Sequence, residues 1–274
     1  HELATRIAPM RPASEGWDRI DLLAAGLLAN RAILAERAAV ISADAAVRAA
    51  HTAPAPGLTL TSEYAKAADT SSPWLVGGSL NLPLDIGAPR QVRITSARLA
   101  ALTARYALAD AIWTMRMDIR RALADRLVGL RLQPLLAEEV ALRTRRLAGL
   151  EHRRAAGEID RSEVERARAE LADATRRTDA TALRAEQALT ALAAATGLSR
   201  AVLEEHSLAW PGFDGPSPLS AVPDATQLLI ARADVLRAVA AYDNAENGLR
   251  GAIAAQSPSV SLQPGYTWER GLVK

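Results

Sequence analysis

The residues that most often carry chemistry are few in this chain and are poorly placed for it. The histidines His1, His51, His152 and His206 do not fall at the spacing of metal ligands, and there is no HExxH motif. The sequence also lacks a GxSxG motif, a phosphate-binding loop and a dinucleotide fingerprint. Gly77 and Gly78 lie inside a strand-like pattern, which favours a bend or a close packing contact over a phosphate cradle.

Two pairs of adjacent glutamates and one pair of methionines also have structural interpretations. The members of each pair lie one or two residues apart on a predicted helix, so their side chains point in different directions. They are therefore unsuited to share a proton in acid–base catalysis or to bind one soft metal ion together. The pairs are Glu138–Glu139, Glu204–Glu205 and Met115–Met117. We predict that the chain is not an enzyme and that it uses no cofactor and no bound metal ion.

The composition favours closely packed helices. Of 274 residues, 49% are hydrophobic but only 4% are aromatic, and alanine and leucine supply most of the excess. The net charge is +2, and arginines alternate with acids, which is typical of solvated helix faces with ion pairs rather than of a nucleic-acid surface. There is no cysteine, which excludes disulfides and thiolate metal sites.

One helix-to-strand junction occurs twice at a constant offset. RAAHTAPAPGLTLTSEY, from Arg48 to Tyr64, is similar to RGAIAAQSPSVSLQPGY, from Arg250 to Tyr266 (250 − 48 = 202). In each copy a proline, Pro56 or Pro258, ends the helical pattern before a strand-like alternation begins. We infer a duplicated half. Because only the first copy continues to a second strand, we expect the sequence to hold about one and a half repeats and to be truncated at its C-terminal end.

Periodicity and turn signals predict a mainly α fold with a small β part. The predicted segments are an N-terminal segment (1–20), a helix (21–52), a strand pair (53–84), a long antiparallel helical hairpin (85–197), a connector (198–223), a second-repeat helix (224–256) and an incomplete second-repeat strand (257–274). We expect Asp21 to cap the first helix and Pro134 to kink or interrupt the hairpin's first helix. Gly157 should mark the hairpin tip, Asp160 or Ser162 should cap the second helix, and Gly197 should end it.

The second helix of the hairpin carries a heptad repeat. One seam position holds Val164, Leu171, Thr178, Ala185 and Leu192, and the position three residues later holds Ala167, Ala174, Thr181, Ala188 and Ala195. Small residues throughout one seam position predict helix axes that lie close together.

The strand segments alternate, so the sheet should have one apolar and one polar face. The apolar positions are Leu58, Leu60, Tyr64, Leu80, Leu82, Val260, Leu262 and Tyr266, and the polar positions are Thr59, Thr61, Ser79, Asn81, Ser261 and Gln263. Runs of about ten residues can cross a bilayer when they are tilted. So few strands would leave unpaired edges, so we expect strands from other copies of the chain to close a barrel.

The order of these elements resembles that of the TolC-type outer-membrane efflux channels, the outer membrane factors of Gram-negative bacteria. Four stretches carry the resemblance: GLLANRAILAERAAV, SLNLPLDIGAPRQVRITSA, HRRAAGEIDRSEVERAR and RADVLRAVAAYDNAENGLRGAIAAQSPSVSLQPGY. Arg31 and Ala233 stand where the family commonly has proline. The PLDIGAPR and GYTWERG stretches resemble the heavy-metal efflux branch.

The resemblance implies a homotrimer with a β-barrel in the outer membrane and an α-barrel of helices that extends as a tunnel into the periplasm. It implies a periplasmic adaptor protein and an inner-membrane pump of the RND type as partners, and passive conduction of drugs or metal ions to the exterior. The apolar strand positions would face outer-membrane lipid, and the polar positions would face the lumen. Arg153, Gly157, Glu158 and Ile159 would form the adaptor-docking tip, and Glu163 would help to close the tunnel entrance. Gly157 and Glu163 also have a structural interpretation, as a helix C-cap and as a first-turn acid favoured by the helix dipole.

Two other classes of protein share part of the pattern. A periplasmic adaptor also has a long helical hairpin, but two halves of a small glycine-rich β-domain should flank it, and the sequence shows none. A soluble coiled-coil scaffold would explain the heptads but not the three alternating strand segments.

Overall fold

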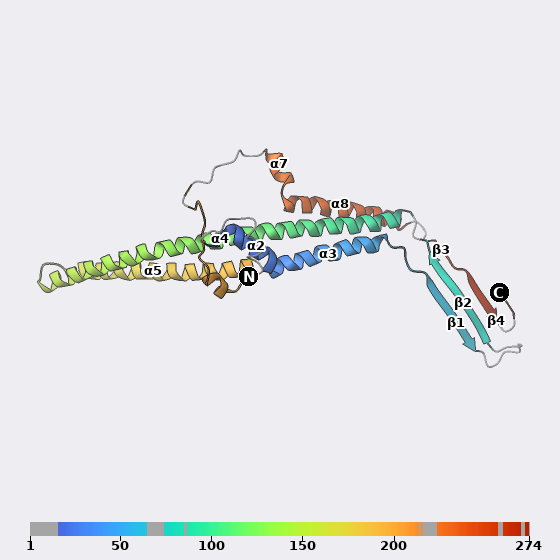
Figure 1. Cartoon of the computed structure of the whole chain (residues 1–274), viewed down its shortest axis with the longest axis horizontal. Coiled ribbons are helices and arrows are strands. Elements are labelled where there is room, and N and C mark those ends of the chain that lie inside the picture. Colours follow the sequence, from blue (N-terminus) through green and yellow to red (C-terminus); the bar gives the residue numbers. More distant parts are fainter. Residues whose placement is uncertain are drawn as a thin grey trace. The chain divides into compact units, whose positions relative to one another are not determined.

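The computed structural model describes residues 16–64, 74–84, 87–213, 215, 224–256, 260–269 and 272–273. The chain forms two units (Figure 1). The hairpin unit consists of His1–Arg37 and Leu108–Pro223, and the sheet unit consists of Ala38–Ala107 and Asp224–Lys274. Two helices, α3 (Arg31–His51) and α4 (Ala88–Ala155), contribute residues to both units, and each unit is described by itself.

The hairpin unit is built on the C-terminal part of α4 and on α5 (Arg161–Thr196), which lie side by side. The predicted seam of α5 is confirmed, because each of its ten residues is buried or half-buried. The two helices approach each other closely at Gly129 and Ala185. A Cβ atom placed on Gly129 would lie only 2.7 Å from the Ala185 Cβ, closer than real Cβ contacts come. Small residues therefore set the spacing of this helix pair, as the heptad predicts.

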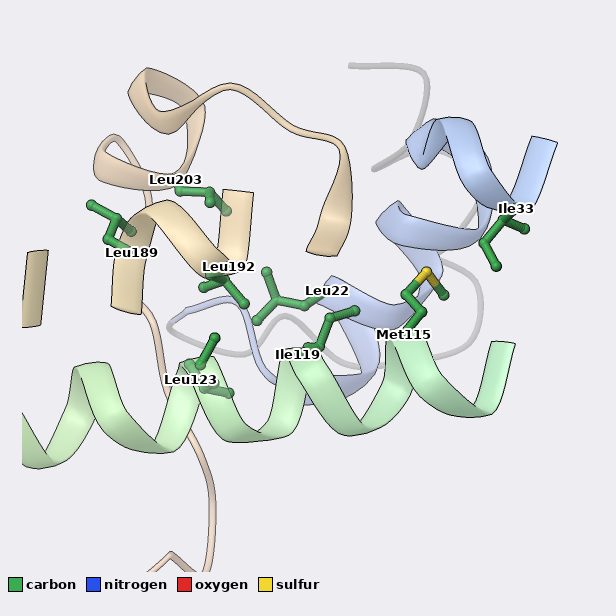
Figure 2. Close-up of a cluster of buried hydrophobic side chains, with 9 residues drawn as sticks. Leu22, Ile33, Met115, Ile119, Leu123, Leu189, Leu192 and Leu203 are labelled. Atoms are coloured by element: carbon green, nitrogen blue, oxygen red, sulfur yellow. The ribbon is translucent and has the colours of Figure 1, made fainter. Parts of the chain in front are cut away.

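A cluster of buried side chains lies where the short helices of the hairpin unit meet α4 and α5 (Figure 2). The short helices are α2 (Arg19–Ala29) and α6 (Arg200–Glu204). The cluster contains Leu22, Ile33, Met115, Ile119, Ala122, Leu123, Leu189, Leu192 and Leu203, all at most 5% exposed. Met115 packs against the backbone of Gly26, so its thioether fills the core, as the packing interpretation predicts.

The predicted helix over 21–52 is in fact two helices, α2 and α3, separated at Asn30. Asn30 has extended backbone angles, and its Oδ1 accepts hydrogen bonds from Ala32 N (2.8 Å) and Ile33 N (3.3 Å). It therefore caps α3 in the usual manner of an N-terminal asparagine. The cap of α2 is Asp18 rather than Asp21. Asp21 completes a capping box, because its carboxylate accepts a hydrogen bond from Asp18 N at 3.0 Å.

Three further details differ from the sequence expectations. Of the two effects predicted for Pro134, the interruption is wrong, because α4 runs unbroken for 68 residues, and the kink stays a prediction. Proline has no N–H to donate to the carbonyl group one turn earlier in the helix. Because Pro134 is exposed, that carbonyl group can bind water instead. The predicted helix over 224–256 is divided into α7 (Ala225–Ile230) and α8 (Ala233–Ala254). Asp160 is the N-cap of α5, but its side chain makes no capping hydrogen bond.

In the sheet unit, the N-terminal part of α4 is bonded to both α3 and α8. Arg105 of α4 forms an ion pair of 2.9 Å with Asp44 of α3. On the other side, the buried Asn247 of α8 donates a hydrogen bond of 3.0 Å to the carbonyl oxygen of Val92. Asp44 belongs to the first repeat and Asn247 to the second, so helices from both repeats pack on α4.

The sheet contains β1 (Gly57–Tyr64), β2 (Trp74–Pro83), β3 (Ser261–Leu262), β4 (Gly265–Glu269) and β5 (Leu272–Val273). Its strand order is β1-β2-β4-β5, and β3 also pairs with β2. All pairs are antiparallel. The predicted strand pair is therefore formed, and the second-repeat strand lies on the opposite edge of β2 from β1. Strand β5 was not predicted. Pro56 lies just before β1, whereas Pro258 lies outside the described residues.

Strands β3 and β4 follow a single register along β2. Leu262 is opposite Leu82 and Gly265 is opposite Ser79, so both pairs have the same sum of residue numbers (262 + 82 = 265 + 79). Pro264 lies between the two strands. Its carbonyl oxygen accepts a hydrogen bond of 2.9 Å from Leu80 N, but proline has no N–H to return one. The second-repeat strand is thus one strand with a single ladder bond missing.

Candidate functional site

The register of the sheet brings the predicted apolar residues to one face. Residues directly opposite each other in an antiparallel sheet share a face. Leu58 is opposite Leu80, and Leu60 and Tyr266 flank Gly78 from its two sides. The remaining predicted residues follow the same parity along their strands: Tyr64 on β1, Leu82 opposite Leu262, and Val260, whose carbonyl accepts a hydrogen bond of 3.0 Å from Leu84 N.

Three further residues belong to this face, which we call the apolar face. Trp74, Val76 and Trp268 have the same parity as Leu80 and Tyr266. The alternation of WLVGGSLNL would have identified the first two. Trp268 continues the local alternation of Val260, Leu262 and Tyr266, and the register with β2 agrees with that prediction.

The apolar face is exposed within the chain. Leu58, Leu60 and Tyr266 are 68%, 76% and 59% exposed. A contiguous set of exposed leucines and aromatics marks a surface that is covered by another apolar phase or by a partner.

Aromatic residues gather at one end of the apolar face. Tyr64 and Trp74 end β1 and begin β2, and their rings meet edge-to-face with centroids 5.0 Å apart. Trp268 lies near the same end, opposite Val76. The other end, toward the helices, carries leucines, among them Leu58, Leu80 and Leu82.

The predicted polar residues share the opposite face. Thr59 is opposite Ser79, Ser261 is opposite Pro83, and Thr61 lies across Gly77 from Thr267. The same register places Gln263 beside Asn81. The sheet therefore presents mainly polar groups on one side and mainly hydrocarbon on the other; the exceptions are Ser62, opposite Val76 on the apolar face, and Leu75, opposite Glu63 on the polar face.

The two repeats are staggered along β2. Leu60 of the first repeat is opposite Gly78, whereas its equivalent in the second repeat, Leu262, is opposite Leu82. The shift is four residues (82 − 78 = 4). The sheet is therefore sheared rather than rectangular.

The hairpin tip is a tight turn at Gly157. Gly157 has a φ of 78°, in the left-handed region that glycine adopts without strain. Its N–H donates to the Arg154 carbonyl at 2.9 Å, and Glu158 N donates to the Arg153 carbonyl at 3.0 Å. These bonds satisfy the last carbonyl groups of α4, which confirms the predicted C-cap.

The other tip candidates lie around this turn. Arg153 Nε and Glu158 Oε2 form an ion pair of 3.1 Å, and both side chains are more than half exposed. Ile159 is half-buried. Glu163 is exposed in the first turn of α5 and has no ion-pair partner among the described residues. The structure thus brings Arg153 and Glu158 together and leaves Glu163 open to solvent.

Ion pairs that were not predicted from the sequence connect α4 to α5 behind the tip. Glu139 of α4 accepts hydrogen bonds from Arg143 (2.8 Å) and from Arg177 of α5 (2.9 Å). These hydrogen bonds, from Arg143 first and then from Arg177, lower the pKa of Glu139 below its ordinary value. Glu170 of α5 binds Arg143 (3.0 Å) and Arg146 (2.9 Å) of α4.

Several of the residues first considered for chemistry have structural partners. Glu139 is part of the ion-pair network, and Glu204 pairs with Arg200 at 2.7 Å. His206 packs against Trp17, with ring centroids 4.5 Å apart. Within the part of the chain that the structure describes, no three histidine or acidic side chains are placed to hold a metal ion. No helix among the described residues is long and apolar enough to span a membrane.

These features define a mainly α protein with a long helical hairpin and a small two-faced sheet. The chain belongs to the outer membrane efflux protein family, whose sequence pattern matches residues 22–198. The family is one of efflux proteins rather than enzymes, in agreement with the prediction from the sequence. No curated protein sequence matches the chain.

Several solved structures share the fold. The chain is similar to a membrane protein from Pseudomonas aeruginosa (TM-score 0.75, 18% identity), covering 94% of this chain and 66% of that one. It is similar to the outer membrane protein VceC from Vibrio cholerae (TM-score 0.69, 18% identity, 93% and 63% covered). A third is the CmeC outer membrane channel of Campylobacter jejuni (TM-score 0.72, 14% identity, 90% and 55% covered). The chain thus spans about two thirds or less of the length of these proteins.

Proposed function

We propose that the chain is a subunit of an outer-membrane channel in a tripartite efflux system. It would passively conduct drugs or metal ions from an inner-membrane pump to the exterior of a Gram-negative bacterium. The observation that carries the proposal is the combination of family membership with a sheet that is apolar on one face and polar on the other.

The sheet supports a place in a membrane barrel built from several copies. A sheet closes into a barrel only if its strands are staggered, and the two repeats are shifted by four residues along β2 (82 − 78 = 4). The aromatic end of the apolar face suits the interface between hydrocarbon and head groups. Among the described strands, the outer edge of β1 has no partner strand. Strands from other copies would pair with such edges, and a homotrimer is the assembly that we propose.

The polar face would then line the channel. Thr59, Thr61, Ser79, Asn81, Ser261 and Gln263 carry hydroxyl and amide groups, which make a hydrated wall, and Glu63 of β1 adds a carboxylate to the same face. Such a wall suits passive conduction, with the energy supplied by the pump. Such a wall is compatible with the passage of drugs and of hydrated metal ions. Membership of the heavy-metal efflux branch, with metal ions as the cargo, is therefore part of the proposal.

The hairpin would form part of a periplasmic tunnel, with its tip directed toward a periplasmic adaptor protein and an RND-type inner-membrane pump. Arg153, Gly157, Glu158 and Ile159 would contact the adaptor. The ion pair between Arg153 and Glu158 holds two opposite charges at the turn, which gives the adaptor a fixed pattern to recognise. Glu163, exposed and without an ion-pair partner in the described residues, would contribute to closing the tunnel entrance.

The two alternative classes fit less well. An adaptor would need two β-domain halves beside the hairpin, whereas here strands from both repeats join in one sheet. A soluble scaffold would leave the exposed apolar face in water.

The deciding experiment is extraction from bacterial membranes. We expect the protein to be found in the outer-membrane fraction, to be released only by detergent, and to sediment as a trimer. Release by salt or by osmotic shock as a soluble monomer or dimer would contradict the proposal.

A further inference from the structure

A hollow interrupts the apolar face at the middle of β2. Its floor is the backbone of Gly77 and Gly78. Its walls are Leu60 of β1, Val76 of β2, and Tyr266 and Trp268 of β4, and it has a volume of about 530 Å³. The hollow lies within the sheet unit and is lined by hydrocarbon and aromatic rings.

The hollow exists because one residue in a row of side chains is glycine. Across the three strands, Leu60, Gly78 and Tyr266 lie side by side. The neighbouring positions of β2 on the same face are Val76 and Leu80, which both project side chains. Leu60 and Tyr266 lie two strand spacings apart, roughly 10 Å, and Val76 and Leu80 flank Gly78 along β2, so the gap is a pit that opens onto the apolar face.

Neither backbone geometry nor crowding requires glycine at position 78. Its φ does not lie in the left-handed region, and a Cβ would meet only Leu60 Cδ2, at an ordinary distance of 3.5 Å. Gly77, on the polar face, differs, since a Cβ there would lie 3.1 Å from Thr267 Oγ1. Packing accounts for Gly77, as predicted from the sequence, but it does not account for Gly78.

We propose that the hollow binds one acyl chain of a membrane lipid. This inference rests on the proposed function, which places the apolar face against the outer membrane. The hollow is continuous with that face through Leu60 and Val76, and its lining side chains carry no charge. A segment of a hydrocarbon chain that enters the hollow from the membrane would contact Leu60 on one side and Tyr266 and Trp268 on the other.

The physical reason is packing rather than the hydrophobic effect, because lipid tails are as apolar as the walls. A void at the surface would forfeit dispersion contacts on every wall atom. An acyl chain is flexible enough to enter the hollow and regain those contacts. The bound chain would therefore be more ordered and would exchange more slowly than its neighbours.

The test measures lipid that remains with the detergent-purified protein. Three forms are compared: the unchanged protein, Gly78→Leu, which fills the hollow, and Gly57→Leu, a control in the same sheet on the opposite face. At Gly57 a Cβ would meet only Asn81 Cβ, at 3.8 Å. We expect the unchanged protein and the control to retain phospholipid after extensive detergent washing, and Gly78→Leu to retain at most half as much.

A second readout keeps the test independent of washing conditions. Trp268 lines the hollow, so phospholipids brominated on the acyl chain should quench its fluorescence, taken as the difference between each form and its Trp268→Phe variant. We expect Gly78→Leu to lose at least half of this quenching and Gly57→Leu to keep it.

The outcomes separate this inference from the proposed function. If the variants reach the outer membrane as trimers but Gly78→Leu retains lipid and quenching like the unchanged protein, the acyl-chain site is wrong and the channel proposal stands. If the unchanged protein never enters the outer membrane, the proposed function fails and the inference with it.

Discussion

The side-chain nitrogen of Asn30 donates a hydrogen bond of 2.7 Å to the carbonyl oxygen of Ala195, 165 residues away. The same side chain caps α3 through its oxygen. One asparagine thus satisfies N–H groups at the start of α3 and a carbonyl group in the last turn of α5, both of which lack partners within their own helices. Beside it, Gly197 packs so closely on Ala29 that a Cβ would lie 2.6 Å from the Ala29 carbonyl oxygen.

Replacing Asn30 should therefore loosen the base of the hairpin. We expect Asn30→Ala to lower the free energy of unfolding by about 1–3 kcal/mol, since it removes a cap and leaves a carbonyl group unpaired. Asn30→Ser keeps a capping oxygen but is too short to reach Ala195, and its effect should be intermediate. Thermal unfolding of the detergent-solubilised protein gives the comparison. Equal stability of Asn30→Ala and the unchanged protein would contradict the assigned role.

The contact between Gly129 and Ala185 makes a second prediction. Gly129→Ala should destabilise the hairpin by about 1–3 kcal/mol, because the added Cβ would force α4 and α5 apart. Gly149→Ala on the same helix is the matched control. No atom lies within 4 Å of a Cβ there, so the change should be neutral or slightly stabilising. Adding Ala185→Gly to Gly129→Ala should restore part of the loss, and a double variant no better than the single one would refute the close contact.

The ion pairs of Glu139 predict a dependence on pH. Its pKa in the folded protein is below the ordinary value of 4.5, so its charged form stabilises the fold at neutral pH. That contribution is complete above 4.5 and is lost as the pH falls through the lowered pKa. The melting temperature of the unchanged protein should therefore fall more steeply below pH 4.5 than that of Glu139→Gln. The effect should be small and should shrink in high salt, because the partners are partly exposed. Parallel curves for the two proteins would rule it out.

Local patterns determined much of this fold. The left-handed glycines at 157 and 197 end their helices where the sequence predicts, and the alanine seam of α5 is buried. The faces of β1 and β2 also follow from the alternation of neighbouring residues. Each of these features depends on residues within a few positions of one another, so a single sequence is sufficient to find them.

The features that were missed depend on partners far along the chain. The break between α2 and α3 at Asn30 depends on the hydrogen bond from its side chain to the Ala195 carbonyl. The helical pattern of the neighbouring residues continues through Asn30, so it does not reveal the break. The position of the second-repeat strand beside β2 likewise depends on pairing between residues almost 200 positions apart, roughly the whole spacing of the two repeats. Arginines and glutamates recur along both α4 and α5, so many different cross-helix ion pairs are compatible with the sequence. Only the register of the two helices decides which of these pairs form.

At the hairpin tip, the two acidic residues should have different roles. We expect Glu158→Gln to weaken binding of the adaptor protein, because it removes the partner of Arg153, and to leave single-channel conductance unchanged. Glu163→Gln should raise the conductance of the channel in planar bilayers, because it removes a charge that helps to close the entrance. Adaptor binding by surface plasmon resonance and bilayer recording give the two readouts. If both variants act on the same readout, the division of roles is wrong.

Neighbouring residues of β2 give the sharpest test of the two faces. Leu82 lies on the apolar face and Asn81 on the polar face, so one lysine substitution can be compared at both places. Leu82→Lys should cost up to about 2–4 kcal/mol, depending on its depth in the bilayer, and should reduce the amount of trimer in the outer membrane. Asn81→Lys should assemble normally and shift ion selectivity toward anions, because its charge would line a water-filled channel. Trimer yield from outer membranes and reversal potentials in planar bilayers measure the two effects. If Asn81→Lys blocked assembly while Leu82→Lys was tolerated, the assignment of the faces would be reversed, since a register shift of one residue exchanges the two faces of a strand.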